Sequence, residues 1–155
     1  YGTDGNYGQL APGDQPDIAG AKFTSPGVKA TDDFQARLQE LVASQGASPL
    51  NVFSYAAEAY DATVLTALAA LQGGATDGQT IRDNLQSVSE GGTKCTTFGD
   101  CAELLASGTD IDYDGLSGPI TFDANGDVTE ATISIYKYSA GNESAWVDQV
   151  SGTLS

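Results

Sequence analysis

The sequence predicts an α/β fold within a single domain. Segments with the 3.6-residue periodicity of helices alternate along the chain with short segments of strand-like composition. The 155 residues fit one domain, and a chain of this size buries roughly 70% of its unfolded surface, which is enough for a hydrophobic core. An Asn-Gly pair at 125–126 is a strong signal for a hairpin turn and predicts β-structure near the carboxyl end.

The first third is predicted to hold one strand and one helix. Residues 1–17 are rich in Gly, Pro, Asp and Asn and are expected to form a loop. A short strand over 18–24 is expected to stop at the Ser-Pro-Gly that follows it. A helix then begins at a cap, which is Thr31 or Asp32, and ends at Gly46.

The middle of the chain is predicted to be helical. The longest helix covers roughly 51–72, because apolar residues recur along one face, and a Gly-Gly pair ends it. Thr76 and Gln79 fit the capping box of a second helix, which is expected to reach Val88. Asp100 is expected to cap a short third helix.

The last third is predicted to be a hairpin followed by a weakly structured tail. The segment GPITF at 118–122 fits one strand, and 128–138 fits its partner across the Asn-Gly turn. Alternation along the second strand predicts two different faces. Residues 139–155 are expected to be weakly structured, with only Trp146 and Val147 able to pin them.

Composition excludes several classes of function. The net charge of -15 disfavours nucleic acid, whose phosphates require a basic surface, and an anionic membrane surface. The chain has no histidine, which removes His-based catalytic triads and the commonest metal ligand. The longest apolar run, at 52–71, is interrupted by Glu58 and Asp61, so no membrane span is predicted. We therefore expect no enzymatic activity, no cofactor and no metal.

The two cysteines, Cys95 and Cys101, lie close together in the polar segment KCTTFGDCA. A local disulfide is the favoured interpretation, and two free thiols are the alternative. A disulfide closing so short a loop contributes roughly 2 kcal/mol and implies an oxidising compartment outside the cytoplasm.

The segment TDIDYDGLSGPITFDANGD, at 109–127, begins like a calcium-binding loop. Asp110, Asp112 and Asp114 alternate and a glycine follows, as in an EF-hand. The loop does not close, because Thr121 stands where the bidentate Glu belongs and strand-like residues follow. Polar turns around a hairpin are the favoured interpretation, and a calcium-binding module is kept as a minor alternative.

Two segments contain candidate ligand-binding residues. In GTDGNY, Asp4 lies between glycines and next to Asn6 and Tyr7, so its carboxylate is able to approach a ligand and pair with an ammonium group. An ordinary Asp-Gly turn is the alternative for this segment. Tyr55 and Glu58 are three residues apart on one face of the predicted long helix, where they line a cleft or form only a polar flank.

Five segments in order resemble the type I periplasmic substrate-binding proteins, and most closely the branched-chain amino acid binding proteins of ABC transporters. The similarity covers residues 1 to about 140. The segments are GTDGNY, TSPG, FSYAAEAYDATVLTALAAL, DGQTIRDNL and DIDYDGLSGPITFDANGDVTEATISIYKY.

The resemblance implies a Rossmann-like fold of two lobes with the ligand in the cleft between them. By this similarity the chain is the C-terminal portion of a longer protein, with a terminal β-hairpin. Residues 1–50 and 115–155 would belong to the second lobe, and the helices within 51–114 would pack on the first lobe. The remaining N-terminal part would then be a partner of this chain.

The resemblance also implies a function and a location. Asp4 matches the acidic residue that contacts the ligand's α-ammonium group, and Tyr55 matches an aromatic residue that lines the cleft, whereas Asn6, Tyr7 and Glu58 lie near these positions. The expected function is the extracytoplasmic binding of an amino acid or similar small polar molecule and its delivery to a membrane permease. The expected location is periplasmic or at the cell surface, with a lipid anchor in the missing N-terminus. A sensory or regulatory domain on the same fold is the alternative.

Overall fold

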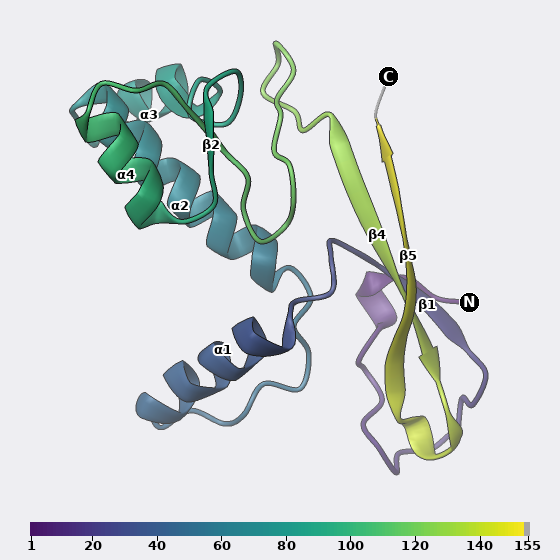
Figure 1. The fold of residues 1–155 in the computed structure, drawn as a ribbon. Helices are drawn as coiled ribbons and strands as arrows, with labels where there is room; N and C mark the ends of the chain where they lie inside the picture. Colours follow the sequence, from purple (N-terminus) through teal and green to yellow (C-terminus); the bar gives the residue numbers. More distant parts are fainter. Residues whose placement is uncertain (154–155) are drawn as a thin grey trace. The chain divides into compact units, whose positions relative to one another are not determined.

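A computed structural model describes residues 1–153, and the chain divides into two compact units. The first unit comprises Tyr1–Ala56 and Thr132–Ser151, and the second is formed mainly by Ala57–Ala131. The elements are of mixed α and β type, as the sequence predicts (Figure 1). Among the described residues, no helix has both the length and the apolar character needed to cross a membrane.

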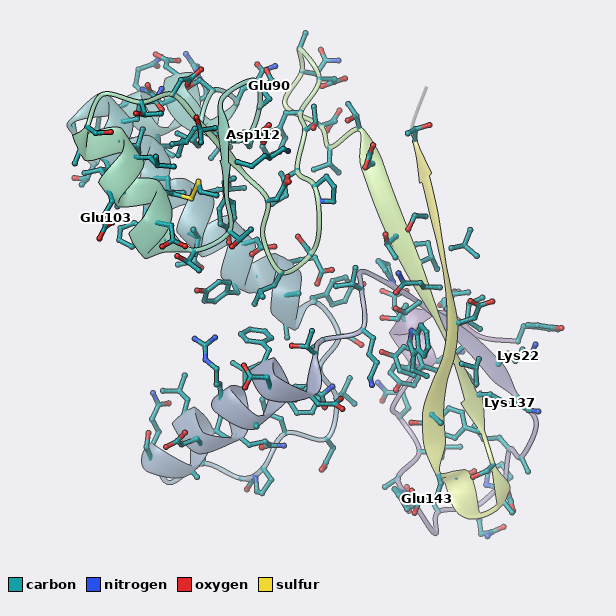
Figure 2. All side chains as sticks on the ribbon, viewed as in Figure 1. Lys22, Glu90, Glu103, Asp112, Lys137 and Glu143 are labelled. Carbon is teal, nitrogen blue, oxygen red and sulfur yellow. A yellow bond between two sulfur atoms is a disulfide. The ribbon has the colours of Figure 1, made fainter. Side chains whose placement is uncertain are left out.

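The first unit is built on a three-stranded sheet in the order β1-β4-β5 (Figure 1). Strand β1 (Lys22–Pro26) runs antiparallel to β4 (Glu130–Tyr138), which pairs Lys22 with Lys137; both lysines are labelled in Figure 2. A short 3₁₀ turn, η2 (Ala140–Asn142), joins β4 to β5 (Ser144–Thr153) in a terminal hairpin. Alternation along β4 buries Ser134 and Tyr138 on one face.

Helix α1 (Asp32–Ser44) completes the first unit. The sequence prediction of its cap is confirmed, because the Thr31 hydroxyl oxygen accepts a hydrogen bond from the Phe34 backbone N–H at 3.3 Å. The side-chain amide of Gln39 holds the segment that follows, since it both donates to and accepts from the backbone of Leu50 at 2.7 and 2.9 Å.

The second unit is a βαβ arrangement packed on a long helix. The parallel strands β2 (Thr93–Cys95) and β3 (Ile111–Tyr113) are connected through α4 (Phe98–Ala106). Helices α2 (Ala56–Gly73) and α3 (Gly78–Leu85) precede them. The core of this unit is apolar and contains the disulfide cysteines; its buried members are Val64, Leu65, Leu68, Ala69, Val88, Cys95, Cys101, Ile111, Tyr113 and Ile120.

Three predicted helix starts are wrong. Helix α2 begins at Ala56 and not near residue 51, because the backbone of Tyr55 has a left-handed φ of 63° that a helix cannot contain. Helix α3 is capped by Asp77, whose carboxylate accepts from two backbone N–H groups, and it ends before Val88. Helix α4 is capped by Thr97, whose hydroxyl oxygen accepts from the Asp100 N–H.

The predicted strands also need correction. Strand β1 begins four residues later than expected and continues through Pro26, which is tolerated because β1 is an edge strand. The expected strand at 118–122 is reduced to two isolated antiparallel bridges, between Gly118 and Gly115 and between Phe122 and Val128. The partners of β4 are β1 and β5 instead.

The expected weakly structured tail is wrong for residues 144–153, which form β5. Trp146 and Val147 do not pin it, because their side chains are exposed. The strand forms because β4 offers it a free edge for backbone hydrogen bonds, and this pairing does not require an apolar pattern. Residues 154–155 lie outside the described part of the chain.

Candidate ligand-binding site

The loop that carries Asp4 is fastened to the edge of β1. The Gly2 N–H donates to the Lys22 carbonyl at 2.9 Å, and the Gly2 carbonyl accepts from the Thr24 N–H at 3.1 Å. A side chain at Gly2 would collide with the Phe23 ring, so only glycine allows this close approach. The strand therefore sets the position of the loop.

Asp4 opens the 3₁₀ turn η1 (Asp4–Asn6), whose ends are held by a capping box. The Asn6 side-chain oxygen accepts from the Thr3 N–H at 2.8 Å, so Asn6 acts on its own turn. The backbone N–H of Tyr7 closes the turn on the Thr3 carbonyl at 3.0 Å. The side chain of Asp4 stays exposed on this ordered turn.

Tyr55 is brought to Asp4 across 51 positions of sequence. Its hydroxyl donates a hydrogen bond of 2.6 Å to Oδ2 of Asp4. The left-handed backbone of Tyr55 costs roughly 1–2 kcal/mol for a residue other than glycine. Strained backbone of this kind concentrates at functional sites, where the surrounding structure maintains it. A side-chain hydrogen bond thus joins two of the candidate residues, Asp4 and Tyr55.

Tyr7 supports the loop through an aromatic cluster. Its ring stacks on Tyr136 with centroids 4.4 Å apart, and Phe23 and Tyr138 pack beside it. Burial raises the pKa of the Tyr7 phenol above its ordinary value. The Tyr138 hydroxyl accepts from the Gly8 N–H at 3.0 Å, which fixes the end of the loop.

Glu58 lies in the first turn of α2, in the second unit. There it lines a cavity of about 350 Å³ whose wall is mostly apolar and includes Leu65 and Phe122. The structure thus describes Glu58 within a different unit from Asp4, Asn6, Tyr7 and Tyr55.

One buried carboxylate, Asp61, was not among the candidate residues. It is 1% exposed and accepts four hydrogen bonds: from the Tyr113 hydroxyl at 2.8 Å, the Leu116 N–H at 3.0 Å, and the N–H and hydroxyl of Ser117 at 2.7 and 2.5 Å. A side chain at Gly115 would strike this carboxylate. Asp61 therefore fastens the segment after β3 onto α2. The signal for it is an acidic residue on the apolar stripe of a helix.

Burial, and secondly the hydrogen bond to Asp61, raises the pKa of the Tyr113 phenol far above its ordinary value. Tyr113 therefore stays protonated and continues to donate to Asp61 at neutral pH. The four hydrogen bonds to Asp61 thus join α2 to β3 and to the segment after β3 within the second unit.

The aspartates that resemble a calcium loop are explained by strand geometry. Asp112 and Asp114 are separated by one residue at β3, and both contact the Lys94 ammonium, at 3.0 and 2.9 Å. Their hydrogen bonds raise the pKa of Lys94. Asp123 instead organises the later turn, since its carboxylate accepts from the Asn125 and Asp127 N–H groups. Within residues 1–153, no group of three or more acidic, Cys or His side chains is arranged to hold a metal ion.

The predicted disulfide between Cys95 and Cys101 is present, with the Cα atoms 5.4 Å apart. It appears in Figure 2 as the yellow bond between α4 and β2. Both cysteines are buried in the core of the second unit, so the bond is structural, and Asp4 and Tyr55 belong to the first unit.

Comparison with known proteins identifies the fold. A family model described as the receptor family ligand binding region matches residues 16–141. The crystal structure of a leucine binding protein, LivK, from Thermotoga maritima is similar, with a TM-score of 0.50 and 17% sequence identity. The similarity covers 86% of this chain and 31% of that one, so the chain spans about a third of that protein's length. No curated protein sequence matches the chain significantly.

The matched range includes Tyr55 and Glu58, whereas Asp4, Asn6 and Tyr7 precede it. It also spans both units and most of the elements that form them. The structural similarity to LivK supports a shared fold, and the family match covers well over half of the chain. The chain therefore belongs to the receptor family ligand-binding regions, proteins of the type I periplasmic-binding-protein fold.

Proposed function

We propose that this chain is part of an extracytoplasmic solute-binding protein that uses Asp4 to bind the α-ammonium group of an amino acid or a similar small polar ligand. The single observation that carries the proposal is the exposed Asp4 carboxylate, held on a turn fastened to β1 and oriented by Tyr55. A carboxylate without a cationic side chain beside it is suited to an ammonium group. The branched-chain amino acids are the first ligands to consider, because the similar LivK is a leucine binding protein.

We also propose that the protein delivers its ligand to a transporter in the membrane. In an ABC uptake system the binding protein closes on its ligand by a hinge motion and delivers it to the permease. We assign residues 1–50 and 115–155 to one lobe and residues 51–114 to the other, with the ligand in the cleft between lobes.

A thermal-shift screen of the standard L-amino acids against the protein in its full natural length tests the proposal, because a bound ligand raises the melting temperature. Asp4→Ala is expected to lower the affinity for the best ligand by roughly 100-fold, since burying the ligand's ammonium group without a partner costs about 3 kcal/mol or more. Asp33→Ala removes an exposed carboxylate on α1 and serves as the matched control. Equal affinity in the wild type and Asp4→Ala would remove Asp4 from the site.

A second candidate function is ligand sensing by a receptor domain. The description of the matching family as a receptor region favours this possibility. Both functions use the same site, so the screen does not separate them. The neighbouring genes do: a permease and an ATPase support uptake, whereas a signalling domain in the same protein supports sensing.

A further inference from the structure

The two oxygens of the Asp4 carboxylate are not equivalent. Oδ2 accepts the Tyr55 hydroxyl at 2.6 Å. Within residues 1–153, Oδ1 accepts no hydrogen bond from the protein. Because the side chain of Asp4 is exposed, Oδ1 keeps all of its acceptor positions for a ligand, whereas Oδ2 has one fewer.

The position of the Tyr55 hydroxyl is set by its neighbours in the chain. The Ser54 hydroxyl lies 3.2 Å from the hydroxyl of Ser25, which ties the preceding residue to β1. The Ala56 N–H donates to the Phe53 carbonyl at 3.2 Å, which closes a turn around Tyr55. Tyr55 is thus held from both sides in its left-handed conformation.

The other non-glycine residue with positive φ in the described part of the chain has a structural explanation. Asn142, at φ 59°, is buried, and its side-chain amide forms hydrogen bonds to the loop that precedes β1. Its side chain bonds the backbone of Asp14, Pro16 and Ile18. Tyr55 is instead 44% exposed, and its strained backbone serves to deliver a hydroxyl to Asp4.

We infer that Tyr55 is a specificity-determining residue that restricts the Asp4 site to primary ammonium ligands and disfavours guanidinium ligands. The inference rests on the proposed function of Asp4. A guanidinium binds a carboxylate through two parallel hydrogen bonds, one to each oxygen. An ammonium is a point charge with three rotatable donors and can form its ion pair with a single carboxylate oxygen. The Tyr55 hydroxyl uses one acceptor position of Oδ2, which makes this oxygen a weaker second acceptor for a guanidinium that must bond to both oxygens.

The hydroxyl of Tyr55, and not its ring, accounts for the preference for ammonium over guanidinium ligands. The exposed ring of Tyr55 would attract ammonium and guanidinium ligands alike through its π-face. Tyr55→Phe keeps the ring and removes the hydrogen bond, so it separates the two contributions. Tyr1→Phe removes a hydroxyl from a fully exposed tyrosine and is the matched control.

Calorimetric titration of the full-length protein tests the inference. Each standard L-amino acid is titrated into the wild type, Tyr55→Phe, Tyr1→Phe and Asp4→Ala, followed by the α-guanidino analogue of each amino acid that binds. The wild type and Tyr1→Phe are expected to prefer the ammonium form. Tyr55→Phe is expected to narrow that preference by about tenfold, the effect of one hydrogen bond to a charged group.

The outcomes separate the inference from the proposed function. An unchanged preference in Tyr55→Phe, with binding that still depends on Asp4, overturns the inference and leaves the proposed function standing. Absence of binding to the wild type, or equal binding to Asp4→Ala, overturns the proposed function and the inference together. A narrowed preference confined to Tyr55→Phe supports both.

Discussion

Replacement of Asp61 by Ala is expected to destabilise the second unit strongly. The substitution removes the acceptor of four hydrogen bonds from Tyr113, Leu116 and Ser117. Tyr113 is fully buried, so its hydroxyl would lose its partner without gaining water, at a cost of roughly 1.5–3 kcal/mol. The donors of Leu116 and Ser117 are partly exposed and would recover water, so each costs only about 0.5–1 kcal/mol. With one donor of Tyr113 and three donors of Leu116 and Ser117, the free energy of unfolding should therefore fall by about 3–6 kcal/mol.

Urea denaturation followed by circular dichroism measures this loss, because the helical signal reports on α2, α3 and α4 of the second unit. Asp61→Asn should cost less than Asp61→Ala, since the amide oxygen retains one acceptor. Asp33→Ala is the control, and as an exposed site it should change the free energy of unfolding by no more than about 0.5 kcal/mol. A loss below about 1 kcal/mol for Asp61→Ala would refute the view of this carboxylate as the lock between α2 and the segment after β3.

Three further predictions follow from the contacts described above. The pKa of Tyr113 is raised in the folded protein, so the unfolded chain loses this proton first and the free energy of unfolding should fall as the pH rises above about 10. Tyr113→Phe should flatten the dependence of the free energy of unfolding on pH in this alkaline range. An unchanged slope in this variant would contradict the prediction. Reduction of the Cys95–Cys101 disulfide should lower the stability of the second unit by roughly 2 kcal/mol, the loop-closure value for so short a loop. The reductant should have no such effect on a variant with both cysteines replaced by Ser. An equal effect on this variant would show that the loss of stability does not come from the disulfide. Gly2→Ala should displace the Asp4 loop from β1, because the added methyl group meets the Phe23 ring, and should weaken ligand binding measured by calorimetry. Full affinity in Gly2→Ala would show that this close approach is not needed.

Local signals in the sequence predicted local structure well. Thr31 has a hydroxyl three residues before an N–H donor, and the cap and the whole of α1 follow from this spacing and from Gly46. The cysteine pair also lies within one short segment, so its disulfide needed no knowledge of the fold. The α/β class followed from the alternation of helical and strand-like segments.

The wrong caps of α3 and α4 were choices between near neighbours, whereas the other errors arose where a distant segment decides the local conformation. Strand β5 has no apolar face and forms because β4 provides a partner edge. The resemblance of Asp110, Asp112 and Asp114 to a calcium loop was not among these errors, because the sequence pattern favoured polar turns; alternate positions at a strand have the same spacing as alternate positions of a calcium loop. The late start of α2 follows from the left-handed backbone conformation of Tyr55, which no local sequence signal predicts.

The sequence by itself determined the α/β class, the first helix, the disulfide and Asp4 as the candidate ligand contact. These depend on residue types and spacings within a few positions, where hydrogen bonds form between near neighbours. Only the tertiary structure decided that the Tyr55 hydroxyl meets Asp4 and that Asp61 holds the segment after β3, across 51 and up to 56 positions. Such contacts depend on how the whole chain closes on itself, and a single sequence carries no local pattern for the partner of a side chain that lies so far along it.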